Sequence, residues 1–196
     1  MSSPHPRLDL VIGCNGAGKS TLIAKHLQPI LHGSVFVNAD EIAKKRWPAA
    51  AEEHSYDAAR IAERTRDTLI ATGRPLIAET VFSHPSKLEL ISTARTAGFD
   101  VHVHAVMIPE ELARHRVRTR VESGGHNVPE DKIRSRYHRL WPLVATAIEG
   151  VESAHVYDNS TDRMRIVAEF IRGVPASPPS WPSWTPAPLR ALTELR

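Results

Sequence analysis

The sequence predicts an α/β fold in three layers, with helices on both faces of a mostly parallel, five-stranded sheet. Apolar runs typical of buried strands alternate along the chain with segments of helical spacing. Parallel strands joined by right-handed helical crossovers produce this β-α-β-α order. We expect the strands over residues 8–12, 34–38, 75–79, 101–108 and 155–157.

The helices between these strands have recognisable ends. Pro109 and Pro129 each stand at a first helical position and are followed by two acidic residues, which favour the positive end of a helix. Gly73 and Gly98 each lie between a helical stretch and a strand, where a left-handed cap is common. A last helix is expected over Thr161–Arg172.

The chain of 196 residues is long enough for one domain with an ordinary hydrophobic core. We expect this domain to cover residues 1–173. The segment 174–196 is rich in proline and carries Trp181 and Trp184 without helical or strand periodicity. It is therefore predicted to be a tail, either flexible or docked on its own domain, and a docking peptide for a partner is the alternative.

Composition limits the function classes. The single cysteine, Cys14, excludes an internal disulfide, and the N-terminus lacks the basic and apolar segments of a signal peptide. No apolar run is long enough to span a membrane, so we expect a cytoplasmic protein. A surplus of arginine between Arg114 and Arg139 favours an anionic ligand such as phosphate. Nucleic acid is less favoured, because aromatic residues hardly occur in that stretch.

The segment Gly13–Ser20 matches the G-x-x-x-x-G-K-[ST] phosphate-binding loop, or P-loop, between a predicted strand and a predicted helix. Glycines let backbone N–H groups converge on phosphate oxygens at a helix N-terminus. The Lys19 ammonium is expected to reach the β- and γ-phosphates of ATP, and the Ser20 hydroxyl to bind Mg²⁺. The predicted nucleotide-binding residues are Gly13, Asn15, Gly16, Ala17, Gly18, Lys19, Ser20 and Thr21.

Asp40 follows the second predicted strand, beside the phosphate loop, where open α/β sheets bind their ligands. A carboxylate there can orient an acceptor hydroxyl and take its proton during phosphoryl transfer. We therefore interpret Asp40 as a catalytic base. The alternative is that Asp40 only caps the helix that begins at Glu41.

Glu79 and Thr80 end the third predicted strand, much as an acidic residue follows a strand in the Walker-B element of other P-loop enzymes. Glu79 could join the Mg²⁺ shell, and together with Thr80 it could bind acceptor hydroxyls. An exposed strand-end carboxylate is the structural alternative. The chain has no N-K-x-D motif after a strand, which argues against a guanine-nucleotide switch.

Residues 114–136 are predicted to form two helices joined by a glycine-containing turn, like a lid. Arginines on a closing segment can neutralise the charge that spreads over the transferred phosphoryl group. A solvated basic face is the alternative. Arg116 and Arg120 share one helix face and are interpreted as catalytic, and Arg134 and Arg136 as substrate-binding.

Asn159 follows the fifth predicted strand, where P-loop kinases commonly place the loop that contacts adenine. We include it among the nucleotide-binding residues. The same residues could instead cap the helix expected after it.

Four segments together resemble the zeta toxin family of P-loop kinases: the phosphate loop, Asn38-Ala39-Asp40-Glu41, Glu79-Thr80-Val81-Phe82-Ser83 and the stretch from Arg120 to Tyr137. The resemblance extends from about Leu8 to Arg172. It implies an ATP- and Mg²⁺-dependent kinase whose acceptor is a small molecule, with the sugar nucleotide UDP-N-acetylglucosamine as the leading candidate. It also implies that a small antitoxin protein could restrain the enzyme.

Carried over by motif, the resemblance implies that Lys19 and Ser20 act in the phosphate loop, Asp40 as base and Glu79 as an acceptor-side carboxylate. The phosphate-clamping arginines are expected among Arg116, Arg120, Arg134 and Arg136. The chain is shorter than the longer toxins of the family and has less room for an elaborate sugar-nucleotide pocket. Other metabolites are therefore alternative acceptors.

Two other function classes remain at this stage. A nucleotide-dependent switch or ATPase would act through a binding partner, with the proline- and tryptophan-rich tail as the contact. A polynucleotide 5′-kinase would keep the loop and the base but need a basic channel along a nucleic-acid backbone.

Overall fold

The computed structural model describes residues 5–122 and 129–194, with the side chains of residues 120–122 left undescribed. Its centre is a seven-stranded sheet of order β2-β3-β1-β4-β5-β6-β7. The strands are β1 (Arg7–Ile12), β2 (Val35–Val37), β3 (Leu76–Thr80), β4 (Asp100–Met107), β5 (Ser153–Asp158), β6 (Arg165–Ile171) and β7 (Val174–Pro175). Strands β1 to β5 pair in parallel, whereas β6 and β7 are antiparallel. The predicted three-layer, mostly parallel α/β fold is confirmed.

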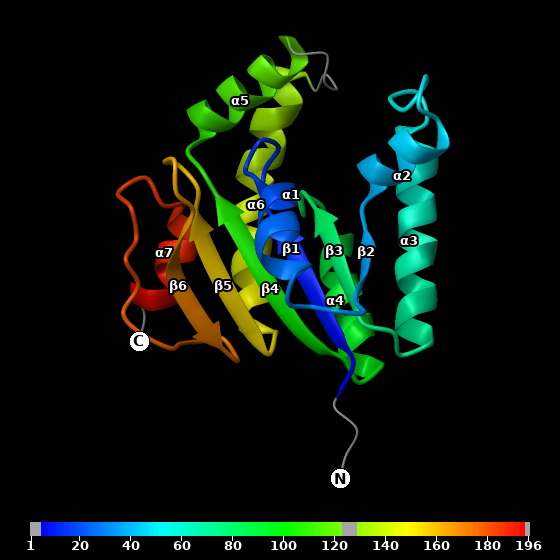
Figure 1. Ribbon diagram of the computed structural model, residues 1–196. Coiled ribbons are helices and arrows are strands. Elements are labelled where there is room, and N and C mark those ends of the chain that lie inside the picture. The colour runs from blue at the N-terminus through cyan, green and yellow to red at the C-terminus, as the bar shows by residue number, and fades with distance from the viewer. Residues whose placement is uncertain (1–4, 123–128, 195–196) are drawn as a thin grey trace.

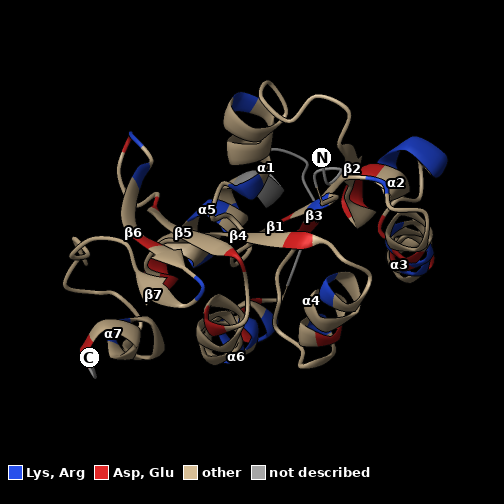
Figure 2. Cartoon of the chain, turned by 90° about the horizontal axis from the view of Figure 1, so that it is seen from below, with Lys and Arg blue, Asp and Glu red and all other residues tan. Residues whose placement is uncertain are grey.

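Helices cover both faces of the sheet (Figure 1). Helices α4 (Ser86–Thr96), α6 (Glu130–Glu149) and α7 (Ala187–Glu194) lie under one face, and α1 (Lys19–Leu22) lies on the other (Figure 2). A π-helical segment, η1 (Ile23–Leu27), continues α1. Helices α2 (Ala39–Arg46) and α3 (Ser55–Ala71) flank the β2 edge, and α5 (Glu110–Glu122) follows β4. The phosphate loop after β1 and the start of α2 after β2 therefore lie at the carboxyl ends of the parallel strands.

The central strands are buried because helices pack on both of their faces. Leu8, Leu10 and Ile12 of β1 have no exposed surface, and the same holds for Val103 and Ala105 of β4. Strands buried on both faces read as continuous apolar runs, which is why the sequence marks them clearly. The hydrophobic core thus fixes the strand ends that carry polar side chains.

The sheet has two more strands than predicted. The prediction of a helix over Thr161–Arg172 was wrong. A bend at 160–163 replaces the start of that helix, and β6 then pairs antiparallel with β5. The segment Arg165–Ile171 is rich in β-branched and aromatic residues, and Val167 and Phe170 bury their side chains in the core. Asp158, at the end of β5, holds the bend by accepting bonds from Ser160 N and from the Arg165 guanidinium.

The segment after Gly173 docks on the domain. Ala176 N donates to Glu169 O (2.8 Å) and Ser180 N to Val167 O (2.8 Å), so the segment runs along the outer edge of β6. It then forms α7, which packs against α6 and buries Leu189 completely. The segment therefore contains regular structure that its aperiodic sequence does not predict. Prolines along it leave few free donors at the sheet edge, which discourages edge-to-edge pairing.

No helix in the described part of the chain combines the length and the apolar character needed to cross a membrane. The boundary of an independently folding domain at residue 173 stays a prediction.

Candidate active site

A cavity of about 810 Å³ opens at the carboxyl ends of the parallel strands. Its wall comes from the phosphate loop, the start of α2, the start of α3, the loop after β3 and the start of α6. This volume suits a small-molecule ligand. Of the predicted site residues, the wall includes Asn15, Gly16, Gly18, Lys19, Ser20, Thr21, Asp40, Glu79, Thr80 and Arg136.

The phosphate loop has the tight backbone path that its glycines predict. Gly18 adopts φ +96°, and a Cβ there would lie 2.4 Å from Asn159 Nδ2, so a side chain would collide and strain the turn. At Gly13 a Cβ would lie 2.4 Å from the carbonyl oxygen of Val106. Ala17 is completely buried beneath the loop. Gly13 and Ala17 therefore shape the loop from below and do not line the cavity.

Lys19 is a buried cation, with 8% of the residue exposed. Its ammonium donates to Cys14 O (3.1 Å) and lies 3.9 Å from Glu79 Oε1. A buried ammonium needs such partners because desolvation disfavours its charged form. Phosphate oxygens bound in the loop would offer the same kind of partner.

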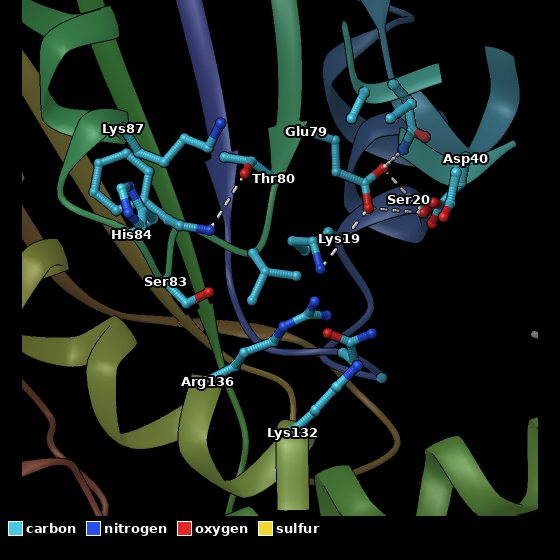
Figure 3. Close-up of a pocket in the computed structure, with 18 of the residues that line it drawn as sticks. Lys19, Ser20, Asp40, Glu79, Thr80, Ser83, His84, Lys87, Lys132 and Arg136 are labelled. Atoms are coloured by element: carbon cyan, nitrogen blue, oxygen red, sulfur yellow. Dashed lines mark hydrogen bonds and ion pairs between the residues drawn. The ribbon is translucent and has the colours of Figure 1, made fainter. Parts of the chain in front are cut away.

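Glu79 is the centre of the polar network at the end of β3 (Figure 3). The Ser20 hydroxyl donates to both of its carboxylate oxygens (3.2 and 3.1 Å), and Asn38 Nδ2 donates to Oε2 (2.7 Å). The alternative of a strand-end carboxylate facing water is therefore wrong. A serine hydroxyl and a carboxylate side by side are oxygen donors of the kind that Mg²⁺ binds, together with phosphates and waters.

Asp40 lies in the first turn of α2 and exposes its carboxylate to the cavity. The helix cap is Asn38, whose Oδ1 accepts a bond from Glu41 N (3.0 Å). The capping alternative for Asp40 is therefore excluded. Figure 3 shows Asp40 on the same side of the cavity as Ser20 and Glu79.

The four predicted arginines have different surroundings. Arg136 lines the cavity, but Arg134 points elsewhere, with 72% of its side chain exposed and its Nε 3.6 Å from Glu110 Oε1. Arg116 donates to two carbonyl oxygens, Gly16 O (3.3 Å) and Asn159 O (3.0 Å). It therefore joins α5 to the phosphate loop. The side chain of Arg120 and the predicted lid turn at 123–128 lie outside the described residues.

Asn159 contacts the phosphate loop, and it does not cap a helix. Its Nδ2 donates to Ala17 O (2.8 Å), and its carbonyl accepts the Arg116 guanidinium. Asn159 and Arg116 thus support the loop from the side of β5. Thr80 lines the cavity next to Glu79, and its Oγ1 accepts a bond from Phe82 N (3.3 Å).

Several cavity residues were not found from the sequence. Lys132 lies one helical turn before Arg136, and this i, i+4 spacing on a predicted helix could have identified it. Ser83 ends the segment Glu79–Ser83 that carries the family resemblance, but Tyr56 of α3, His84 and Lys87 belong to no motif. The fold brings Tyr56, His84 and Lys87 to the cavity.

Cys14 lies in the loop but is not a nucleophile. The residue is 1% exposed, and burial raises the pKa of its thiol to about 11. Because the thiolate is the reactive form, the side chain is inert near neutral pH. Among the residues that the structure describes, no three His, Cys, Asp or Glu side chains cluster closely enough to hold a metal. A metal ion here would depend on Ser20, Glu79 and ligand oxygens.

A phosphate loop after β1, a carboxylate at the end of β3, another just after β2 and a cavity before them are the arrangement of a P-loop kinase. The chain belongs to the zeta toxin family, whose model matches residues 1–166. A relative in Haemophilus influenzae, an uncharacterized protein, is 31% identical over 126 residues, which is 64% of this chain and 88% of the relative.

Solved structures share the fold at low sequence identity. The AvrRxo1-ORF1:-ORF2 complex with ATP superposes with a TM-score of 0.68 at 18% identity, over 88% of this chain and 60% of that chain. A structure from the PezAT toxin-antitoxin system of Streptococcus pneumoniae gives 0.62 at 18% identity, over 86% and 73%. A putative kinase of Chloroflexus aurantiacus gives 0.56 at 18% identity, over 69% and 78%. The chain thus spans about three fifths of the AvrRxo1 chain.

Proposed function

We propose that this chain transfers the γ-phosphate of ATP to a hydroxyl group of a small metabolite, with Mg²⁺ as cofactor. The observation that carries the proposal is that one cavity holds both the phosphate loop and the Asp40 carboxylate, with space left beside them for an acceptor. A switch or ATPase needs no such acceptor space next to a base. Family membership supports the same reaction class.

In this proposal the loop from Gly13 to Thr21 binds the triphosphate, and Lys19 pairs with its β- and γ-oxygens. Ser20 and Glu79 would hold Mg²⁺, because their oxygens already lie 3.1–3.2 Å apart. The ion, when bound, neutralises charge on the two terminal phosphates. Glu79 is therefore assigned to the metal side of the site, in place of the acceptor side.

Asp40 orients the acceptor hydroxyl and accepts its proton. Arg136, with Lys132 one turn away, faces the cavity and supplies positive charge to the phosphoryl group in transfer. Arg116 positions the loop through Gly16 and Asn159, so its part in catalysis is indirect. Thr80 is left as a hydroxyl contact for the acceptor.

UDP-N-acetylglucosamine is the leading acceptor, on the basis of the family. The experiment that tests the reaction incubates the protein with labelled ATP, Mg²⁺ and a panel of sugar nucleotides, nucleosides and oligonucleotides. Oligonucleotides belong in the panel because the Pnkp1/Rnl/Hen1 RNA repair complex shares the fold, with a TM-score of 0.58 at 21% identity. A labelled small molecule is the expected product. Transfer only to oligonucleotide ends, or ATP hydrolysis alone, would contradict the proposal.

A small antitoxin is the partner that the family suggests, as in the PezAT toxin-antitoxin system. Expression of the chain in bacterial cells tests whether its activity is toxic, with Lys19→Ala as the inactive control. Growth arrest by the wild type alone would support a toxin. Equal growth of both strains would contradict that role.

A further inference from the structure

A row of polar side chains crosses one face of the sheet, outside the cavity. It consists of Asp9 of β1, His104 of β4, His155 and Tyr157 of β5, and Glu169 of β6, on four strands that are neighbours in the sheet (Figure 1). The register places His104 beside His155, and His155 beside Glu169. The described residues that line the cavity include none of the five. The proposed phosphoryl transfer therefore does not use this row.

Asp9 determines where the proton of His104 lies. The Asp9 side chain has no exposed surface, and its carboxylate accepts two bonds from the Arg7 guanidinium (2.6 and 2.7 Å). Burial raises the pKa of Asp9, but the bonds from Arg7 and His104 outweigh burial and keep that pKa below its usual range. An ionised carboxylate only accepts, so we assign the proton of the neutral ring to His104 Nε2, 2.8 Å from Asp9 Oδ1. His104 Nδ1 then accepts the Tyr157 hydroxyl (3.2 Å).

His155 has an unsatisfied nitrogen. Its Nε2 lies 3.3 Å from Glu169 Oε1, and a carboxylate at this position favours the tautomer with the proton on Nε2. Its Nδ1 is buried and has no hydrogen-bond partner among the described residues, although the ring as a whole is partly exposed. A second proton would bind at Nδ1 and would become a buried donor without an acceptor, which is costly. The surroundings of His155 therefore favour the neutral ring.

The rings of His104 and His155 stack on each other. Their centroids are 5.7 Å apart and their planes differ by 10°, so a proton on one ring disfavours a proton on the other. A second proton on His104 would bind at Nδ1, where it would displace the proton that the Tyr157 hydroxyl donates. Burial raises the pKa of Tyr157 to about 12, so this hydroxyl does not ionise near neutral pH. Both rings are thus held in their neutral form.

The charges that face this pair do not reverse the preference. They are Arg7 and Asp9 of β1, His102 of β4 and Glu169 of β6. Burial lowers the pKa of His155, the His104 ring lowers it further, and Glu169 acts in the opposite direction without reversing the shift. Burial and the charge of Arg7 also lower the pKa of His102. Two histidines on this face therefore take up protons less readily in the folded chain than in the unfolded one.

These shifts make stability depend on pH. A histidine whose pKa is lowered by folding binds its proton more readily in the unfolded chain, where the pKa is about 6.5. Its contribution to stability is complete above that value and is lost as the pH falls from the unfolded pKa to the folded pKa. Asp9 stays ionised in this range because its pKa is lowered, so its contribution does not change there.

We propose that the stacked pair of His104 and His155 is an acid-sensitive switch of stability within the sheet. While both rings are neutral, they connect β1 to β6 through Asp9, Tyr157 and Glu169. Proton uptake at Nδ1 of either ring disrupts this connection and destabilises the folded chain below about pH 6.5. The inference does not depend on phosphoryl transfer, so the full chain can be tested without nucleotide or acceptor.

The first test is urea unfolding between about pH 7.5 and about pH 5.0 for the wild type, His155→Gln and the control His115→Gln. Glutamine keeps an amide that can bond Glu169 but does not titrate, and His115 is an exposed histidine of α5. One proton taken up on unfolding raises the unfolding constant by up to about tenfold per pH unit. We expect the acid-induced rise to be at least about threefold larger in the wild type and His115→Gln than in His155→Gln. Equal rises in all three proteins, or a wild type that gains stability on acidification, overturn the proposal.

The second test uses Glu169→Gln, which should change the pH dependence in the opposite sense. This variant lacks the carboxylate that favours a proton on His155, so the acid-induced rise in its unfolding constant should exceed that of the wild type about twofold or more. A purely structural role of Glu169 would lower stability equally at every pH. An unchanged or weaker pH dependence contradicts the switch.

The third test needs no variant. In nitrogen-15-labelled wild type at about pH 7.5, the ring nitrogens of His104 and His155 should show two neutral imidazoles with the proton on Nε2. A charged ring at this pH, or a proton on Nδ1 of either ring, overturns the proposal even if a substituted chain fails to fold.

Discussion

Replacing Asp40 by asparagine separates a kinase from a nucleotide-binding switch. Asparagine keeps the size of the side chain but cannot accept the proton of an acceptor hydroxyl. Loss of a general base lowers the rate roughly 10²- to 10⁴-fold, which corresponds to about 2.7–5.4 kcal/mol in the activation barrier. ATP affinity should change little, because the phosphate loop keeps all of its groups.

The structure limits the competing effects of this substitution. Asn38 provides the cap of α2, so the capping bond to Glu41 N survives. The change removes one negative charge from the first turn of an exposed helix, which costs roughly 0.3–1 kcal/mol of stability. This stability term is several times smaller than the expected loss of transition-state stabilisation. A slow Asp40→Asn enzyme should therefore still be folded at the assay temperature.

Glu41→Gln is the matched control. Glu41 is in the same helical turn, its side chain is 62% exposed, and it lies outside the cavity. The measurements are ATP affinity, single-turnover phosphoryl transfer and melting temperature for both variants. We expect a large loss of transfer in Asp40→Asn alone. Near-wild-type transfer by Asp40→Asn, or an equal loss in Glu41→Gln, would refute the role of Asp40 as base.

Three further variants test other parts of the site and fold. Glu79→Gln should raise the Mg²⁺ concentration that gives half-maximal rate about tenfold, measured by Mg²⁺ titration of the transfer rate. If only the KM for the acceptor changes, Glu79 belongs to the acceptor side of the site. Arg136→Ala should lower kcat roughly 10²- to 10³-fold. The Arg134 side chain lies near Glu110, so Arg134→Ala should keep kcat within a few-fold of the wild type. Equal losses of kcat in the two variants would contradict the assignment of Arg136. Leu189→Ala should lower the free energy of unfolding by roughly 2–5 kcal/mol, measured by denaturant titration against the exposed Arg190→Ala. A silent Leu189→Ala would mean that α7 is not part of the folded core.

The positions of the five parallel strands and the phosphate loop could be predicted because their signals are local. Buried parallel strands read as continuous apolar runs, and the loop is one continuous segment with a fixed pattern. The placement of Asp40 and Glu79 follows from the same signals, since Glu79 ends one predicted strand and Asp40 follows another. Polar residues at the carboxyl ends of neighbouring parallel strands meet at one edge of the sheet.

The other half of the cavity could not be predicted in this way. Lys87 reaches it because α4 starts there after the loop from β3, and Tyr56 because α3 begins beside α2. Neither residue stands at a strand end or in a motif, so its position depends on how helices dock. The strand β6 was missed for a related reason. A segment of seven residues is too short to show clearly whether its apolar residues follow the period of a strand or of a helix. Pairing with β5 decided its conformation.

The polar network around Glu79 gives a physical reason for an acidic residue at the end of β3. Lys19 is buried, so its ammonium needs polar or charged partners, and the Ser20 hydroxyl faces the cavity. Glu79 contacts both, with its carboxylate fixed by Asn38. In the proposed reaction, Ser20 and Glu79 would hold a divalent cation, which would supply charge neutralisation for the phosphates. One carboxylate can thus stabilise the buried Lys19 and, with Ser20, organise the metal side of the site, and a place at the end of β3 fixes it for both tasks.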